Sequence, residues 1–209
     1  MKFGENISSN ELEPRQKKLD PGNCSTLIYT SGTTGPPKAV MISHDNITWT
    51  TANICEGGYM DLNHTERIIS YLPLSHIAAQ IIDIHAMMAL GGCTYFAQPD
   101  ALKGSLTTSL KEVKPTFFFG VPRVWEKIQE KMVQIGRETT GIKKMISTWA
   151  KGCGAAKTQL NQFGNAGGVP FGYGCANSIV LSKIKEALGL QEVSSQPFIH
   201  SYCPLNYLM

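Results

Sequence analysis

Leu27-Ile-Tyr-Thr-Ser-Gly-Thr-Thr-Gly-Pro-Pro-Lys38 is the most informative stretch of this 209-residue chain. Gly32 and Gly35 allow the backbone to take a positive φ and to approach a ligand closely. Successive N–H groups in such a turn can converge on an anion. Four hydroxyl groups and one mobile cation add further donors: Thr30, Ser31, Thr33, Thr34 and Lys38. This combination predicts a loop that holds a polyphosphate.

The spacing of the loop excludes a Walker A motif, which requires G-x-x-x-x-G-K-[ST]. Counted from Gly32, the second glycine of that motif would fall on Pro37. The residue after Lys38 is Ala39, where the motif has serine or threonine. The nucleoside triphosphatase interpretation therefore fails on spacing.

Short strands and helices alternate on either side of the loop. We expect strands at 26–29, 39–42, 68–72, 93–96 and 116–119. Ser43 is the predicted N-cap of a helix that runs to about Cys55, with Asp45 in its first turn. Further helices are expected at 77–90, 102–113, from Pro122 to about 135, at 141–160 and at 178–188. The alternation predicts an α/β fold in which helices cover a β-sheet.

Composition narrows the class of protein. Hydrophobic residues make up 42% and charged residues 17% of the chain, as in a globular protein, and a net charge of +3 gives no indication of nucleic acid. Six scattered cysteines without a C-x-x-C pair predict free thiols in a reducing cytosol. The N-terminus shows no signal peptide, and the apolar stretch 77–90 falls short of a transmembrane segment. We therefore expect a cytoplasmic protein.

The loop resembles the signature loop of the adenylate-forming superfamily, which includes acyl-CoA synthetases, luciferases and the adenylation domains of peptide synthetases. One departure is Ala39, which replaces a glycine that usually follows the lysine. The resemblance implies ATP binding by nine residues: Thr30, Ser31, Gly32, Thr33, Thr34, Gly35, Pro36, Pro37 and Lys38. It also implies that Thr30 contacts Mg²⁺, and that Thr33, Thr34 and Lys38 hold the β- and γ-phosphates.

The segment Tyr71-Leu-Pro-Leu-Ser-His76 is similar to a superfamily segment that lies beside the acyl pocket. The resemblance puts His76 near the substrate carboxylate and the α-phosphate, as a catalytic residue. A histidine after a strand is also commonly a capped or buried structural residue, and both interpretations remain open. His85, inside the apolar stretch, is interpreted as structural.

Two further runs resemble a narrower family. Val121-Pro-Arg-Val-Trp-Glu-Lys127 is similar to long-chain fatty acyl-CoA synthetases. Together with Ser43-His-Asp-Asn-Ile-Thr-Trp49 it looks most like their bubblegum-type branch. The implied small-molecule partners are ATP, a fatty acid and CoA. Arg123 and Trp125 could line an acyl tunnel or fasten their helix to the sheet, and the packing role is favoured.

The resemblance divides the chain into three parts: a flexible lead-in at 1–23, a partial AMP-binding domain at 24–190 and a divergent tail at 191–209. The family's Tyr-Gly-x-Ser/Thr-Glu element is absent, since Phe171-Gly-Tyr-Gly-Cys175 lacks the acid. We therefore expect a truncated fragment that is inactive by itself. Two alternatives stay open: another adenylate-forming enzyme, such as a peptide-synthetase domain, or a non-catalytic isoform that acts by binding.

Residues 123–157 contain eight lysines and arginines and three glutamates. A basic surface of this kind suits an enzyme that takes fatty acids from lipid, and it predicts peripheral contact with intracellular membranes. The alternative, which is favoured, is an ordinary solvated helix face.

Overall fold

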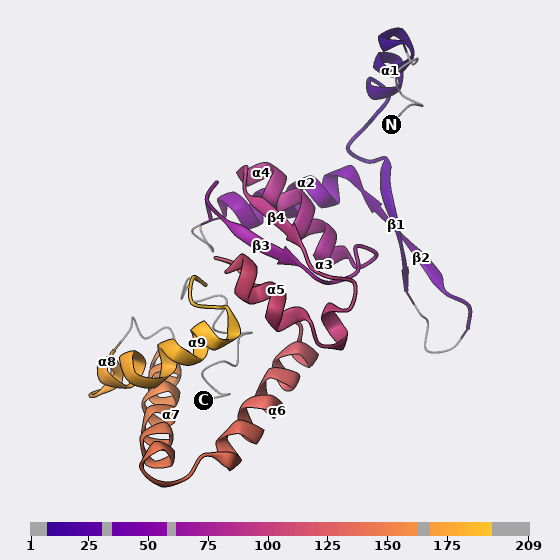
Figure 1. The fold of residues 1–209 in the computed structure, drawn as a ribbon. Helices are drawn as coiled ribbons and strands as arrows, with labels where there is room; N and C mark the ends of the chain where they lie inside the picture. Colours follow the sequence, from indigo (N-terminus) through magenta and orange to yellow (C-terminus); the bar gives the residue numbers. More distant parts are fainter. Residues whose placement is uncertain (1–7, 31–34, 58–61, 163–167, 194–209) are drawn as a thin grey trace.

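The computed structural model describes residues 8–30, 35–57, 62–162 and 168–193 (Figure 1). The predicted divergent tail lies outside this part of the chain except for residues 191–193. Strands and helices are mixed as the sequence predicts, so the α/β class is confirmed. No helix among the described residues is both long enough and apolar enough to cross a membrane.

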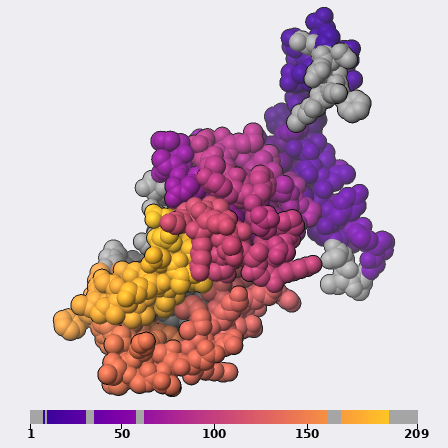
Figure 2. Space-filling view, in the orientation of Figure 1, coloured from indigo at the N-terminus to yellow at the C-terminus, as the bar shows by residue number. Residues whose placement is uncertain are grey.

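The predicted phosphate loop joins the two strands of an antiparallel hairpin. Strand β1 (Cys24–Thr30) pairs with β2 (Lys38–Ser43), and both predicted strands are confirmed. Figure 2 shows the hairpin standing out from the rest of the molecule. Most of its side chains are exposed, including apolar ones such as Tyr29 and Met41. This hairpin thus differs from the expectation that helices cover the sheet throughout.

Helix α2 (His44–Glu56) follows β2 directly and begins at the predicted cap. Ser43 Oγ accepts a hydrogen bond from the Asn46 backbone N–H at 3.1 Å, and Asn46 Oδ1 accepts one from the Ser43 N–H at 3.1 Å. This reciprocal pair satisfies two backbone donors that a helix start otherwise leaves free. The hairpin is therefore continued by a firmly capped helix.

A parallel pair of strands forms the second sheet. Strand β3 (Arg67–Ser70) pairs with β4 (Cys93–Phe96), and the crossover between them is the helical stretch Ile77–Leu90. That stretch consists of α3 (Ile77–Ala79), the π-helical η1 (Gln80–Ala86) and α4 (Met87–Leu90). Gly91 ends it with φ 70°, as predicted for the Gly-Gly stop. Parallel strands need such a crossover, and here it buries Ile81 and Met87.

The C-terminal half is helical. It contains η2 (Ala101–Lys103), α5 (Leu106–Val113), α6 (Pro122–Glu138), α7 (Gly141–Gln162), α8 (Tyr173–Ala176), η3 (Asn177–Leu181) and α9 (Ser182–Leu188). The helix predicted from residue 102 begins only at Leu106, because Gly104 has φ 153° and interrupts it. Gly189, with φ 78°, ends α9 as predicted. Helices α6 and α7 lie at the end of the molecule away from the hairpin (Figure 1).

Two expectations need correction. Residues 116–119 do not form a strand: the backbone N–H groups of Thr116 and Phe117 both point to the Arg67 carbonyl oxygen, so no ladder continues. Phe117 and Phe118 are buried instead in two different clusters. Within the lead-in at 1–23, the structure contains a helix that was not expected, α1 (Ser9–Gln16), capped by Ser8.

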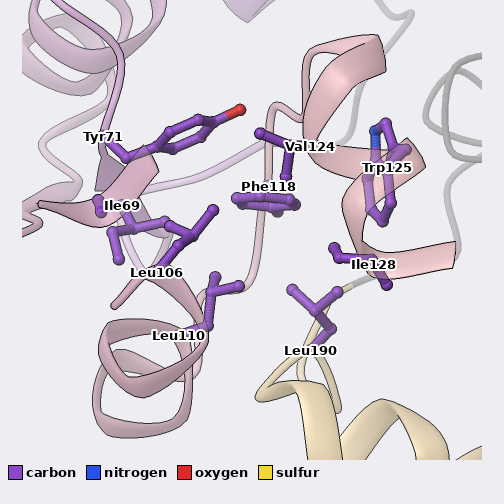
Figure 3. Packing of buried hydrophobic residues seen from close by; sticks show 10 residues of the cluster. Ile69, Tyr71, Leu106, Leu110, Phe118, Val124, Trp125, Ile128 and Leu190 are labelled. Carbon is purple, nitrogen blue, oxygen red and sulfur yellow. The ribbon is translucent and has the colours of Figure 1, made fainter. Parts of the chain in front are cut away.

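The main core lies where β3, α5, α6 and Leu190, which follows α9, meet. Figure 3 labels nine of its side chains: Ile69, Tyr71, Leu106, Leu110, Phe118, Val124, Trp125, Ile128 and Leu190. Phe118 stands between two aromatic partners. Its ring stacks on Tyr71 at 5.6 Å and meets Trp125 edge-on at 5.5 Å, measured between ring centroids. These contacts join segments that are far apart in the sequence.

A candidate ATP-binding site

The two ends of the phosphate loop are paired across the hairpin. Thr30 and Lys38 are register partners, and Thr30 Oγ1 donates to the Lys38 carbonyl oxygen at 3.4 Å. Both side chains are exposed at the mouth of the loop. The loop thereby presents one hydroxyl and one cation side by side. Four of the predicted ATP contacts, Ser31, Gly32, Thr33 and Thr34, lie outside the described residues.

Gly35 has the positive φ that the sequence predicts, while its contact with ATP stays a prediction. The φ is 123°, a conformation that side chains rarely adopt, and a Cβ placed there would meet no heavy atom of the described residues within 4 Å. The constraint at this position is therefore conformational rather than steric. Pro36 and Pro37 follow it as exposed residues and lead directly into β2.

Ala39 does not crowd the loop, although family members usually have glycine there. It lies on β2 opposite Tyr29 and is exposed. Among the described residues other than glycine, Lys114 alone has a positive φ, so Ala39 occupies ordinary extended backbone. A methyl group at this position is therefore compatible with the hairpin.

His76 caps the start of the crossover helix. Its Nδ1 atom accepts a hydrogen bond from the Ala78 backbone N–H at 3.2 Å, and the side chain is exposed. A neutral ring that accepts through Nδ1 carries its proton on Nε2, which remains a donor. The far ends of β1 and β2 point away from α3 in Figure 1. The capping role is observed, and the catalytic role stays a prediction.

Tyr71 anchors the segment that leads to His76. Its hydroxyl donates to the Phe119 carbonyl oxygen at 2.9 Å and accepts from the Val121 N–H at 3.2 Å. Burial raises the pKa of Tyr71 to about 12, although the Val121 hydrogen bond acts in the opposite direction. The hydroxyl ties the end of β3 to the turn before α6. This relationship was not evident from the sequence.

Asp83 is a second residue whose role the sequence reasoning missed. It lies on η1 in the middle of the apolar crossover and is 7% exposed. Burial raises the pKa of the Asp83 carboxyl, and a hydrogen bond with the Ser70 side chain partly offsets this. The sequence did contain a signal for a buried carboxyl, namely an aspartate within an otherwise apolar helical stretch. His85, interpreted as structural, is half-buried on the same segment.

The run that begins at Val121 serves mainly to pack. Trp125 is 3% exposed, and its indole N–H donates to the Gly120 carbonyl oxygen at 2.9 Å. Arg123 is exposed. The favoured interpretation of this run, in which it fastens α6 to the core, is thus supported for Trp125.

The described residues contain no group of three or more His, Cys, Asp or Glu side chains that could hold a metal ion. All five described cysteines, Cys24, Cys55, Cys93, Cys153 and Cys175, are free, as the scattered spacing predicts.

The fold and the loop agree with a family assignment. Residues 2–191 match the family model described as "AMP-binding enzyme", and the chain belongs to that family. The match begins well before residue 24, where the sequence resemblance was expected to start, and ends close to the expected boundary at 190.

Among curated proteins, the chain is 52% identical over 194 residues to the long-chain-fatty-acid–CoA ligase ACSBG2 of Xenopus laevis. It is 45% identical over 206 residues to the human protein of the same name. The resemblance to bubblegum-type long-chain fatty acyl-CoA synthetases is thereby confirmed. The alignments include 91% and 99% of this chain but only 26% and 30% of the relatives, so the chain spans between a quarter and a third of their length.

The second alignment bears on the predicted divergent tail. An alignment that includes 99% of the chain must contain most of residues 191–209. Divergence of this segment remains a prediction for the part of the chain outside the described residues.

A solved structure supports the fold independently. The structure of "McyG A-PCP complexed with phenylalanyl-adenylate" matches 64% of this chain and 22% of its own, with a TM-score of 0.50 and 22% identity. At that identity the likeness concerns the fold alone, and it agrees with the predicted adenylate-forming α/β architecture.

Proposed function

We propose that this chain supplies the triphosphate-binding part of an ATP-dependent long-chain fatty acid–CoA ligase. The proposal rests on the hairpin loop, which presents Thr30 and Lys38 as paired residues at its mouth and an unobstructed Gly35 between them. The names of the relatives, which are long-chain-fatty-acid–CoA ligases, support this substrate class over amino acids. Because the chain spans only part of their length, the reaction is proposed for the whole protein.

The proposed reaction has two steps. A carboxylate oxygen of the fatty acid attacks the α-phosphorus of ATP, and the bond to the leaving pyrophosphate breaks. The sulfur of the CoA thiolate then attacks the acyl carbonyl carbon, and AMP leaves with the electron pair of the acyl–oxygen bond. The products are acyl-CoA, AMP and pyrophosphate. Holding the reactants in this geometry is the main task of the protein.

Within this scheme, the residues of the loop bind and orient the triphosphate. The Lys38 ammonium neutralises charge on the β- and γ-phosphates, and the loop N–H groups and hydroxyls donate hydrogen bonds to their oxygens. His76, through Nε2–H, is the candidate donor to the substrate carboxylate or the α-phosphate. This requires the Tyr71–His76 segment and the loop to approach each other when the substrates bind.

The described residues fit Mg²⁺ that is carried by the nucleotide. Mg²⁺ keeps several water ligands and is commonly held by phosphate oxygens with few protein ligands. Thr30, whose hydroxyl makes only a long hydrogen bond of 3.4 Å, is the candidate protein contact. When bound, the ion would neutralise charge that develops on the phosphates.

A cytoplasmic location and peripheral contact with intracellular membranes are the remaining parts of the proposal. The free cysteines suit a reducing compartment. A substrate with a long acyl chain partitions into lipid, so an enzyme at the membrane surface gains access to it.

Calorimetric titration of the purified chain with MgATP tests the proposal directly. Lys38→Ala should weaken binding roughly 10- to 150-fold, because one charge-assisted hydrogen bond contributes about 1.5–3 kcal/mol. Lys111→Ala, which alters an exposed lysine on α5, is the matched control and should bind as the parent chain does. Equal affinity of the two variants would contradict the assignment of the loop.

Turnover separates the alternatives. The isolated chain should release little pyrophosphate from ATP with palmitate and CoA, because the loop and His76 provide only part of a complete site. Pyrophosphate release that depends on an amino acid would favour a peptide-synthetase domain. ATP binding without any turnover, with either substrate, is expected both for the partial ligase and for a non-catalytic isoform. Adding the portion of a longer relative that this chain does not span should restore turnover for the partial ligase. A non-catalytic isoform should remain without turnover.

A further inference from the structure

The side chain of Gln80 ties the exposed turn before His76 to the buried crossover. Its amide donates from Nε2 to the Leu74 carbonyl oxygen at 2.7 Å. Gln80 is the first residue of η1 and is half-buried. Its neighbours Ala79 and Ile81 are 1% and 7% exposed, so the backbone around it is embedded in the fold. The amide therefore connects a fixed point of the crossover to a turn at the surface.

The turn itself runs from Pro73 to His76. The His76 N–H donates to the Pro73 carbonyl oxygen at 2.9 Å, which closes a four-residue β-turn. All four residues of this turn are exposed. The carbonyl groups of its two central residues, Leu74 and Ser75, take no part in the closing bond. Because Gln80 binds the first of these carbonyl groups, it fixes the turn against the crossover.

Helix geometry explains why residue 80 reaches back to Leu74. Side chains on a helix point toward its N-terminus, so Gln80 leans over the residues that precede the crossover. Gln80 also begins a π-helical stretch, and such stretches are rare and occur frequently at functional sites. The start of the crossover thus supplies an amide donor to the turn that carries His76.

The His76 ring depends on this turn for its direction. Its Nδ1 atom accepts from the Ala78 N–H at 3.2 Å, which leaves Nε2–H as the donor that the proposed function assigns to the substrates. That contact is long and exposed, so water competes with it. The His76 carbonyl oxygen accepts from the Ala79 and Gln80 N–H groups at 3.1 and 3.2 Å. His76 is therefore held on the crossover side by these backbone bonds, and on the turn side through Leu74 by the Gln80 amide.

We infer that Gln80 is a positioning residue for His76. Its amide holds the turn so that Nδ1 of His76 keeps the Ala78 contact and Nε2–H stays available to the substrates. Gln80 acts through His76 and does not itself contact the reacting atoms. The inference rests on the proposed function for the role of His76, whereas the orienting effect follows from the hydrogen bonds alone.

Nitrogen NMR of the full chain, labelled at its five histidines, tests the orienting effect. At mildly alkaline pH, a neutral ring held by Ala78 should give two well-separated His76 resonances, one from unprotonated Nδ1 and one from protonated Nε2. His76→Ala identifies both resonances by their loss. Gln80→Met keeps a long unbranched side chain without an N–H donor. It should move the two resonances toward each other, because the second tautomer becomes populated.

Two further variants separate orientation from packing. Gln129→Met, on the exposed face of α6, is the matched control and should leave the His76 resonances unchanged. Gln80→Lys restores an N–H donor for the Leu74 carbonyl oxygen and should restore the parental separation of the two resonances. If Gln80 served stability alone, Gln80→Met would lower the urea midpoint and leave the His76 resonances in place, which would overturn the inference. Equal displacement of the resonances in the Met and Lys variants would overturn it as well.

Addition of MgATP with palmitate separates this inference from the proposed function. The two substrates should shift the Nε2 resonance of the parent chain, and the shift should be smaller in Gln80→Met. An equal shift in both chains would overturn the positioning role. So would a parent chain that binds MgATP without any change at Nε2, because His76 would then lie outside the site although the loop assignment holds. If Lys38→Ala binds MgATP as Lys111→Ala does, the loop assignment fails, and the tautomer comparison still decides the orienting effect.

Discussion

The carbonyl oxygen of Gly120 accepts a hydrogen bond from the indole N–H of Trp125 at 2.9 Å, and the indole ring covers the side of Gly120 where a Cβ would be. A methyl group there would lie 2.7 Å from Trp125 Cζ2. The ring therefore fits only because residue 120 has no side chain. Phe118 completes the arrangement, since it meets the edge of Trp125 and stacks on Tyr71.

Gly120→Ala should destabilise the chain by about 1–3 kcal/mol, because Trp125 must move out of a packed position. The measurement is urea unfolding followed by circular dichroism. Gly152→Ala is the matched control: it lies within α7 with no heavy atom within 4 Å of its Cβ position, so helix propensity should make it neutral or slightly stabilising. Equal effects of the two changes would contradict the packing of Trp125.

Tyr71→Phe should lower stability by about 1–3 kcal/mol at pH 7. The change keeps the ring that stacks on Phe118 but removes two partly buried hydrogen bonds, to the Phe119 carbonyl oxygen and from the Val121 N–H. Tyr29→Phe, which alters a tyrosine that is 67% exposed, is the control and should have a negligible effect.

The same tyrosine should make stability depend on pH in the alkaline range. Burial raises the pKa of Tyr71 from 10.0 to about 12, so the folded chain keeps a proton that the unfolded chain loses. The resulting contribution to stability is complete below pH 10 and is lost as the pH rises through about 12. The stability difference between the parent chain and Tyr71→Phe should therefore shrink between pH 10 and 12. A constant difference would contradict the assigned pKa.

Asp83→Asn should stabilise the chain at neutral pH. Burial raises the pKa of Asp83 above its unfolded value of 3.8. The protonated carboxyl therefore contributes stability that is present below pH 3.8 and is lost as the pH rises through the folded-state pKa. The amide is neutral at all these values. Urea unfolding should show a larger advantage of the variant at pH 7 than at pH 4, while Glu126→Gln on the exposed face of α6 should show none at either pH.

His76→Ala should lower stability by about 0.5–2 kcal/mol, the typical effect of losing an N-cap side chain. His76→Asn retains a side-chain acceptor for the Ala78 N–H and should recover most of this loss. Thermal unfolding of both variants provides the comparison. If asparagine were no better than alanine, the contact of Nδ1 with Ala78 would not stabilise the helix.

The sequence alone determined the local elements and the chemistry of the loop. Capping by Ser43, the stop at Gly91 and the strands on either side of the loop depend on neighbouring residues, so periodicity and turn chemistry predict them correctly. The positive φ of Gly35 is likewise a local feature that the sequence predicts. The family assignment also follows from contiguous motifs, chiefly the loop ending at Lys38 and the run that begins at Val121.

Only the tertiary structure decided where distant segments meet. The aromatic run at 116–119 has strong strand propensity, yet its backbone forms no ladder. Phe117 and Phe118 are buried in two different clusters, and the Tyr71 hydroxyl bonds to the Phe119 carbonyl oxygen, so the backbone follows these contacts instead of a neighbouring strand. The burial of Asp83 and the exposure of Ile142 and Met145 on α7 likewise depend on what packs against each helix. A helical pattern specifies which residues share a face, but the partners of that face come from the fold.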